Sequence, residues 1–202
     1  GAGFMDYWVM KLDASGNIEW QNTIGGSKDD FCLDGHATSD GGYILAGHSK
    51  SNISGDKTEN TLGLFENNDM WIVKLNSTGG IEWQNTIGGL HLDYAEIIRE
   101  LPDGSFIVAG NSSSAIGYDK TVDLHGTGGL TYDIWVLKLT STGSIIWQKN
   151  IGGSADDYFS DIILTADGGY LIGAESYSGI SYDKTEPLFG DSDNWLIKLD
   201  AE

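Results

Sequence analysis

The stretch Asp6-Tyr7-Trp8-Val9-Met10-Lys11-Leu12 decides the fold, because the chain repeats it. After a short turn it is followed by Ile18-Glu19-Trp20-Gln21-Asn22-Thr23-Ile24-Gly25-Gly26. Both parts return at residues 69–75 and 81–89 and again around Trp135 and Trp147, and a partial copy of the first part lies at residues 194–199. Trp8, Trp71, Trp135 and Trp195 are 63, 64 and 60 residues apart. Such a period indicates a stacked or radial array of similar units.

One period reads as four strands. The first is predicted at 31–38 and the second at 43–47, with Ser39-Asp40-Gly41-Gly42 between them as a tight hairpin turn. The two tryptophan stretches are the third and fourth strands. The third strand is apolar on both faces until its terminal lysine, so it must be covered on both sides. Helix signals are almost absent, and the most helix-like segment, 95–100, aligns with strands in the other copies and is therefore predicted as a strand.

The predicted fold class is all-β, a β-propeller-type array of four-stranded antiparallel blades with about three repeats of about 63 residues. Residues 1–202 then form one repeat domain. Its parts are the third and fourth strands at 6–26, complete blades at 27–89 and 90–153, and the first three strands of a further blade at 154–200. Three arrangements stay open: an arc of a longer propeller, a homodimer that pools its blades into a ring of about six, and an open array stacked head to tail.

The repeat resembles that of the bacterial secreted β-propeller proteins. The likeness is carried by residues 8–13, 16–21, 25–30 and 40–47 and by their equivalents in the later copies, and it covers almost the whole chain. It implies a propeller fold within a large bacterial protein at the cell surface or outside the cell. Such repeats serve as scaffolds and adhesive surfaces, so the resemblance implies no particular chemistry. A weaker likeness to the tryptophan-docking motif of quinoprotein propellers is limited to residues 76–83.

The charge balance excludes some classes of partner. The chain has 30 acidic and 11 basic residues, which gives a net charge of −19. So acidic a chain repels nucleic acid and anionic membranes. No run of about 18 apolar residues is present, so we expect no membrane insertion. The expected partners are other propeller blades of a parent protein, a second copy of the chain, or a protein or glycan ligand.

The loop between the second and third strands holds the best candidate site. An Asp-Lys-Thr triplet recurs there at residues 56–58, 119–121 and 183–185, and each loop ends at an aspartate before the tryptophan strand. One interpretation is a Ca²⁺ site with carboxylate ligands. The other is a turn in which the Asp and Thr side chains satisfy backbone amides. The calcium ligands would be Asp56, Glu59 and Asp69 in the first loop, Asp119, Asp123 and Asp133 in the second, and Asp183, Glu186 and Asp193 in the third.

Other recurring residues have structural interpretations. The acids after the double glycine are Asp29, Asp30, Asp93, Asp156 and Asp157. Their functional interpretation is cation binding or acid catalysis, but we expect them to pair with the lysines of the third strands or to cap turns. Six aromatic residues in or beside the long loops could stack on sugars or anchor the loops: Phe65, Tyr118, Tyr132, Tyr177, Tyr182 and Phe189. The histidines show no metal-ligand spacing, so no cofactor other than Ca²⁺ is expected.

The tryptophans are the expected structural residues, each wedged between neighbouring blades with its N–H bonded to a carbonyl of the next blade. They are Trp8, Trp20, Trp71, Trp83, Trp135, Trp147 and Trp195.

Near-identical blades favour a function without catalysis, because an active site needs residues that one blade alone carries. We therefore expect a non-enzymatic extracellular module that acts as a scaffold or as a protein-binding or glycan-binding surface. Two alternatives stay open. One is a carbohydrate-active or other hydrolytic enzyme that uses the loop carboxylates. The other is a structural protein that assembles by exchange of its terminal strands.

Overall fold

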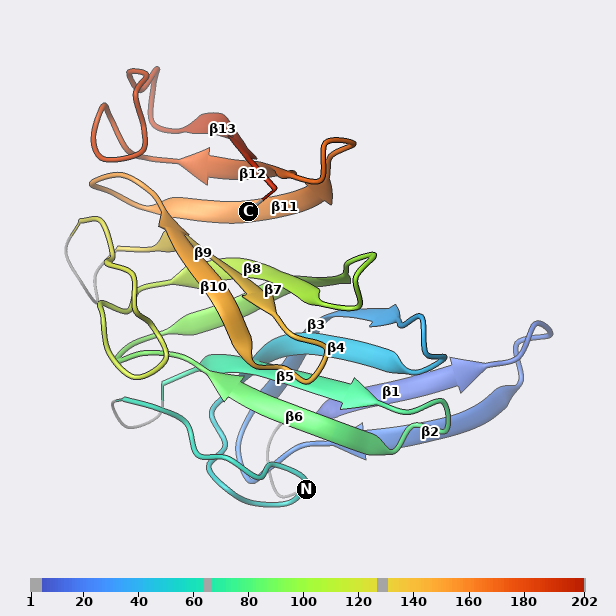
Figure 1. The fold of residues 1–202 in the computed structure, drawn as a ribbon. Helices are drawn as coiled ribbons and strands as arrows, with labels where there is room; N and C mark the ends of the chain where they lie inside the picture. Colours follow the sequence, from blue (N-terminus) through green and yellow to red (C-terminus); the bar gives the residue numbers. More distant parts are fainter. Residues whose placement is uncertain (1–4, 64–66, 127–130, 202) are drawn as a thin grey trace.

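Thirteen strands are present in the computed structural model, which describes residues 5–63, 67–126 and 131–201 (Figure 1). They are β1 (Tyr7–Leu12), β2 (Ile18–Ile24), β3 (Asp30–Ala37), β4 (Tyr43–Ser49), β5 (Asp69–Leu75), β6 (Ile81–Ile87), β7 (Asp93–Glu100), β8 (Phe106–Ser112), β9 (Asp133–Leu139), β10 (Ile145–Ile151), β11 (Asp157–Leu164), β12 (Tyr170–Ser176) and β13 (Asp193–Leu199). These residues form no helix, and so none that is long and apolar enough to cross a membrane.

The strands form four antiparallel sheets, each a simple meander. Sheet 1 is β1-β2, sheet 2 is β3-β4-β5-β6, sheet 3 is β7-β8-β9-β10 and sheet 4 is β11-β12-β13. The all-β class is thus confirmed. The helix-like segment 95–100 belongs to β7, which confirms that the repeat overrides its local propensity.

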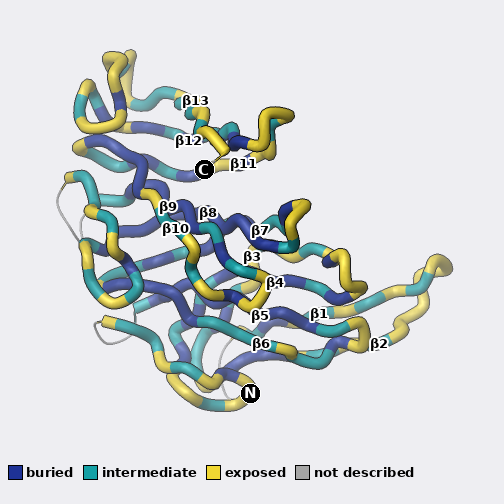
Figure 2. The backbone as a smooth tube through the Cα atoms, viewed as in Figure 1, coloured by how far each residue is buried: buried dark blue, intermediate teal, exposed yellow. Residues whose placement is uncertain are grey.

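Successive sheets pack face to face, and an apolar cluster fills each junction. Tyr7 of sheet 1 packs on Trp71 of sheet 2, Ile72 of sheet 2 lies in one cluster with Trp135 of sheet 3, and Val136 of sheet 3 lies in another with sheet 4. The first strands of successive sheets are in contact, β3 with β7 and β7 with β11. The central strands of the two middle sheets, such as β5, β8 and β9, are therefore the most deeply buried, as the dark tubes in Figure 2 show.

The tryptophans of the third strands do not all have the same environment. Trp71 and Trp135 are completely buried, as expected of strands covered on both sides. Trp8 is 66% exposed, so the expectation that every repeated indole is buried is wrong at this position. The reason is that sheet 1 has another described sheet on one face only, and Trp8 lies on the open face.

The predicted indole contact between sheets is made by the fourth strand. Trp20 Nε1 donates to the carbonyl of Ser77 in the next sheet at 3.1 Å. Trp71 and Trp135 instead donate to a glutamine of their own sheet, Gln84 at 3.1 Å and Gln148 at 3.2 Å. Trp83 and Trp147 pack edge-on against Phe106 and Tyr170, and Trp195 lies half-buried against sheet 3.

Glycine is required where this indole meets the next sheet. Gly79 has a φ of +83°, and a Cβ atom there would lie 2.7 Å from the Trp20 ring. Gly143 meets Trp83 in the same way, with a Cβ distance of 2.8 Å. The turn between the third and fourth strands of one sheet thus covers the fourth-strand indole of the sheet before it.

Candidate functional site

The three Asp-Lys-Thr triplets lie in tight reversals at one end of the sheets. In the first loop, Ser54 and Lys57 exchange two backbone hydrogen bonds, of 3.1 and 3.0 Å. Gly117 with Lys120 and Ser181 with Lys184 pair in the same way. Inside each reversal one residue has a positive φ: Gly55 in the first, Tyr118 in the second and Tyr182 in the third. The reversal turns each lysine inward, since all three lysines are buried.

The lysine, rather than the aspartate before it, reaches the interior. Lys57 Nζ donates to Thr86 Oγ1 in β6 and lies 5.2 Å from the centre of the Trp71 ring. Lys120 Nζ donates to Ser112 Oγ at 2.7 Å and to Asn150 Oδ1 at 3.0 Å, and lies 4.9 Å from the Trp135 ring. Sequence analysis did not predict this role, although the lysine recurs in loops of otherwise different sequence and this recurrence could have indicated it.

Carboxylates surround each of these ammonium groups. Asp30, Asp69 and Glu59 raise the pKa of Lys57 by their charge, but burial outweighs them and lowers it to about 8. Asp93 and Asp133 stand in the same relation to Lys120, whose pKa burial also lowers to about 8. In sheet 4, Lys184 Nζ lies 3.5 Å from a carboxylate oxygen of Asp193. Each loop thus brings its own cation to a group of acids.

The acid that begins each first strand caps the double-glycine turn before it. Asp30 accepts the backbone N–H of Gly26 at 2.6 Å and the hydroxyls of Ser49 and Ser51. Asp93 and Asp157 accept the equivalent glycine N–H at 2.7 and 2.6 Å. The capping interpretation is confirmed for these three. The other two do not cap the glycine amide: Asp29 is 3.9 Å from Lys50, and Asp156 accepts the N–H of Tyr132.

The acid that begins each middle third strand also has a raised pKa. Burial raises the pKa of Asp69 to about 8, although the N–H of Leu62 donates to it. Burial also raises the pKa of Asp133 to about 6, against hydrogen bonds from Asn150 and from the N–H of His125. One oxygen of each carboxylate is buried and has no hydrogen-bond partner among the residues that the structure describes. These groups keep their protons to a higher pH than exposed aspartates do.

The aspartate of each triplet joins two sheets. Asp56 accepts the N–H of Gly25 at 3.3 Å through its side chain, and its own N–H donates to the Gly25 carbonyl at 2.8 Å. Asp119 bonds in this way to Gly88, and Asp183 to Gly152. The aspartate of each triplet therefore binds a backbone amide, as the turn interpretation expects. That amide belongs to the glycine just after the fourth strand of the preceding sheet, however, and not to the loop itself.

The remaining predicted calcium ligands are dispersed. Glu59 accepts the N–H of Thr86, Asp193 accepts that of Phe189 at 3.1 Å, and Asp123 and Glu186 are exposed. Within residues 5–63, 67–126 and 131–201, no three His, Cys, Asp or Glu side chains form a group that could hold a metal ion. The calcium site therefore stays a prediction. In the described contacts, the cation beside these acids is the ammonium group of the buried lysine.

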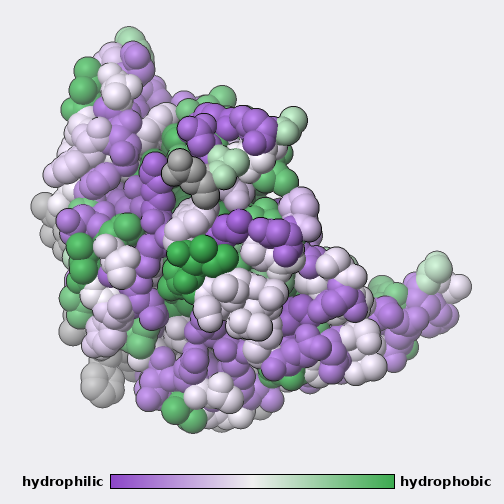
Figure 3. Space-filling view, viewed as in Figure 1, coloured by the Kyte–Doolittle hydropathy of each residue, from purple (hydrophilic) through white to green (hydrophobic). Residues whose placement is uncertain are grey.

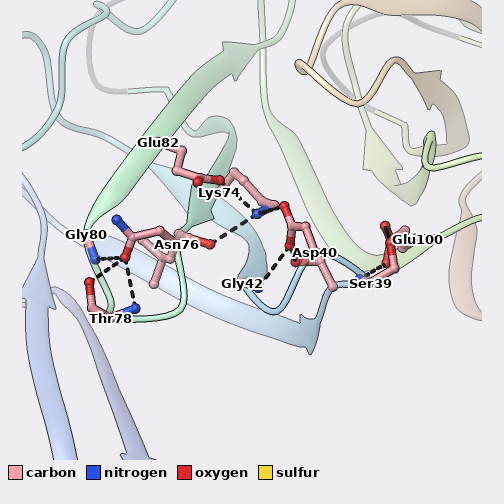
Figure 4. Close-up of polar contacts among 11 residues, drawn as sticks. Ser39, Asp40, Gly42, Lys74, Asn76, Thr78, Gly80, Glu82 and Glu100 are labelled. Carbon is pink, nitrogen blue, oxygen red and sulfur yellow. Dashed lines mark hydrogen bonds and ion pairs between the residues drawn. The ribbon is translucent and has the colours of Figure 1, made fainter.

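At the opposite end of the sheets, the lysine of each complete third strand binds the acid of the hairpin turn. Lys74 Nζ lies 2.8 Å from Asp40 and 2.9 Å from Glu82, as Figure 4 shows. Lys138 and Lys198 bind Asp103 and Asp167 in the same way. The expectation that these lysines pair with the acids after the double glycine is therefore wrong, because those acids lie at the other end of the sheet. Glu100 accepts from Ser39 and ties sheet 3 to sheet 2.

A row of aromatic rings, which sequence reasoning missed, crosses sheets 2 to 4 at the loop end. Successive ring centres are 4.9, 4.7, 6.2, 5.6 and 6.1 Å apart. The rings belong to Phe31, His48, Tyr94, Tyr132, Tyr158 and Tyr177. Tyr132 and Tyr177 thus anchor loops against the first strands. The sequence feature that could have indicated this row is the aromatic residue that follows the first aspartate of β3, β7 and β11.

The loop tips carry exposed apolar side chains. Ile53, Ile116 and Ile180 occupy the same place before each reversal, and all three are exposed. Tyr118 and Tyr182 within the reversals are 60% and 65% exposed, and Phe189 is exposed as well. Phe65 lies outside the described residues. Elsewhere the view in Figure 3 is mostly hydrophilic, with a compact hydrophobic group near its centre.

Comparison with other proteins adds no assignment. No protein-family model matches the sequence, and no curated protein matches it either.

Proposed function

We propose that this chain is an arc of a β-propeller that acts outside the cell as a non-enzymatic scaffold and displays a protein-binding surface on its loop tips. The propeller arrangement is supported by face-to-face sheets whose first strands converge. The extracellular setting rests on the resemblance of the repeat.

The observation that carries the binding proposal is the exposed isoleucine at the same place in each loop. Ile53, Ile116 and Ile180 contribute almost nothing to the described core, yet an apolar residue stands at each tip. A periodic row of apolar side chains with polar surroundings is typical of a protein interface. Isoleucine offers no polar group to a sugar, so the row favours a protein ligand over a glycan.

The tyrosines of the reversals support the same proposal. Tyr118 has a φ of 52° and Tyr182 a φ of 48°, in the left-handed region that costs an L-residue about 1–2 kcal/mol. Gly55 occupies this position in the first loop without that cost. Strained residues cluster at ligand-binding positions, and Tyr118 keeps its strain while its ring faces solvent.

The contacts of the loop acids support a function without catalysis. Asp56, Asp119 and Asp183 are engaged with backbone amides of the neighbouring sheet. A general acid or base must instead be within reach of a substrate and able to release or take up a proton there. In the described contacts these carboxylates hold sheets together.

The test is a binding screen with a matched pair of variants. The immobilised chain is presented to bacterial surface and secreted protein fractions and to a glycan array. We expect retained protein ligands whose binding falls at least tenfold in Ile116→Ser. Ile146→Ser is the control, because Ile146 is exposed to nearly the same extent, 52% against 53%, but lies in β10 away from the loop tips. Equal binding by both variants, or retention on glycans alone, would contradict a protein-binding row at the tips.

A further inference from the structure

Sheet 3 holds a buried lysine against a buried side-chain amide. Lys120 Nζ donates to Asn150 Oδ1 at 3.0 Å, although the two residues are 30 positions apart in the chain. Lys120 is completely buried and Asn150 is 7% exposed, so both groups are shielded from bulk water. Because Oδ1 is bonded to Cγ, the lysine nitrogen lies next to the carbon atom of a carboxamide. The contact joins the loop before β9 to the strand β10.

Carboxyl groups lie on both sides of this pair. Asn150 Nδ2 donates to Asp133 Oδ2 at 2.6 Å, so Asp133 binds the nitrogen that an attack on Cγ would release. The other oxygen of Asp133 is buried and has no hydrogen-bond partner within the described part of the chain. On the lysine side, Lys120 Nζ donates to Ser112 Oγ at 2.7 Å, and Ser112 Oγ donates to Asp93 at 2.5 Å. The cluster thus combines a nucleophile, an amide, and a carboxyl group beside each.

Burial makes the lysine and the acid suited to a reaction with the amide. A lysine attacks a carbonyl carbon only as the neutral amine, and burial lowers the pKa of Lys120 to about 8. A leaving group is protonated only by an acid that still holds its proton, and burial raises the pKa of Asp133 to about 6. The fold also holds the two reactants together, which in well-oriented intramolecular reactions is equivalent to a concentration of about 10⁵–10⁸ M.

Sheet 2 has the same arrangement except for the amide. Lys57 donates there to Thr86 Oγ1, and Thr86 pairs with Trp71 across the strands as Asn150 pairs with Trp135. A threonine side chain has no carbonyl carbon for an amine to attack. Of the two four-stranded sheets, only sheet 3 therefore brings a buried amine and a carboxamide together.

We propose that Lys120 and Asn150 form an amide bond with each other in the folded chain, with Asp133 as the general acid and with release of ammonia. Nζ passes one proton through Ser112 Oγ to Asp93, attacks Cγ of Asn150 and forms the new C–N bond. Asp133 gives its proton to Nδ2 and takes the second proton from Nζ, the bond between Cγ and Nδ2 breaks, and ammonia leaves. No atom is oxidised or reduced, and the reaction consumes nothing besides the chain itself.

The bond ties the loop of sheet 3 covalently to its fourth strand. It restricts the unfolded chain in the way a disulfide does, so the cross-linked chain resists unfolding more strongly. Cys32 is the only cysteine, so the chain has no intrachain disulfide for this purpose. The cross-link does not depend on the loop tips binding a partner.

Mass spectrometry of the purified, folded chain tests the proposal. The intact chain should be lighter than its sequence by one ammonia, and a protease digest should contain a branched peptide that joins Lys120 to Asn150. Asn150→Thr, which reproduces the arrangement in sheet 2, should have the full sequence mass. Lys149→Met is the matched control, because Lys149 is exposed beside Asn150 in β10, and this variant should still lose ammonia. A chain of full sequence mass, or a loss of ammonia without the branched peptide, overturns the proposal.

Two further variants test the roles of the acid and of the amide, with the branched fraction followed over time after purification. Asp133→Asn keeps the amine and the amide and should form the bond at least about 100-fold more slowly. An undiminished rate would overturn the role of Asp133. Thr86→Asn places an amide beside Lys57 and should add a second loss of ammonia, with a branch between residues 57 and 86. The absence of this second branch would overturn the inference that the amide is what distinguishes sheet 3 from sheet 2.

Discussion

Replacing Lys120 by methionine tests whether the buried lysines compensate the acids around them. Lys120 is completely buried, donates to Ser112 and Asn150, and lies over the Trp135 ring. Methionine keeps an unbranched apolar chain of similar length, so the substitution removes the charge and the donors and leaves most of the packing.

The expected loss is about 3–5 kcal/mol of unfolding free energy, the usual cost of removing one partner from a buried charged group. Asp93 and Asp133 remain buried without their cation, and Asn150 loses a donor. Within this total, the cation–π contact with Trp135 accounts for about 1–2 kcal/mol. Adding Asp93→Asn to Lys120→Met removes one uncompensated charge and should recover about 1–2 kcal/mol.

Urea unfolding at pH 7, followed by tryptophan fluorescence, measures these differences. Lys149→Met is the control, because Lys149 is exposed in β10 of the same sheet and its loss should change stability by less than about 0.5 kcal/mol. The reasoning is refuted if Lys120→Met lies within about 1 kcal/mol of the unmodified chain. It is also refuted if Asp93→Asn lowers the stability of Lys120→Met further.

Three other predictions follow from the contacts described above. Burial raises the pKa of Asp133 from 3.8 to about 6, so stability should fall by about 3 kcal/mol as pH rises from about 4 to 6, and urea titrations should show this slope flattened in Asp133→Asn. Tyr118→Gly relieves the left-handed strain, so it should leave the free energy of unfolding unchanged or raise it by up to about 1 kcal/mol, while it weakens ligand binding; a clear loss of stability would contradict this. In Gly79→Ala the new methyl group meets the Trp20 ring and should cost at least about 2 kcal/mol of stability, whereas Gly41→Ala, at nearly the same φ (+84°) but in open space, should cost about 1 kcal/mol; equal costs would refute the role of the indole contact.

The strands and their order could be predicted because the signals that specify them are local and repeated. Asp-Gly turns, apolar alternation and the tryptophan stretches recur in every copy, so an ambiguous segment such as 95–100 could be interpreted from its equivalents. The complete burial of β5 followed from its two apolar faces. Each of these inferences needs only neighbours within one sheet or one turn.

The role of the loop lysine could not be predicted in the same way. The partners of Lys57 are Asp30, Asp69 and Thr86, which come from three different strands. In the sequence, the lysine stands between Asp56 and Thr58 and looks like a solvated charge in a polar loop. Only the fold shows that the reversal turns it inward. The exposure of Trp8 was missed for a related reason, since its local sequence matches that of the buried Trp71 and the difference lies in which sheets flank it.

Two kinds of contact between sheets repeat with the same polarity along the array. At every junction the later sheet supplies the aspartate that binds the double glycine after the fourth strand of the earlier sheet. At the first two junctions the later sheet also supplies the turn that covers the fourth-strand indole of the earlier sheet. Interfaces of this head-to-tail kind form rings when the rotation closes and open filaments when it does not.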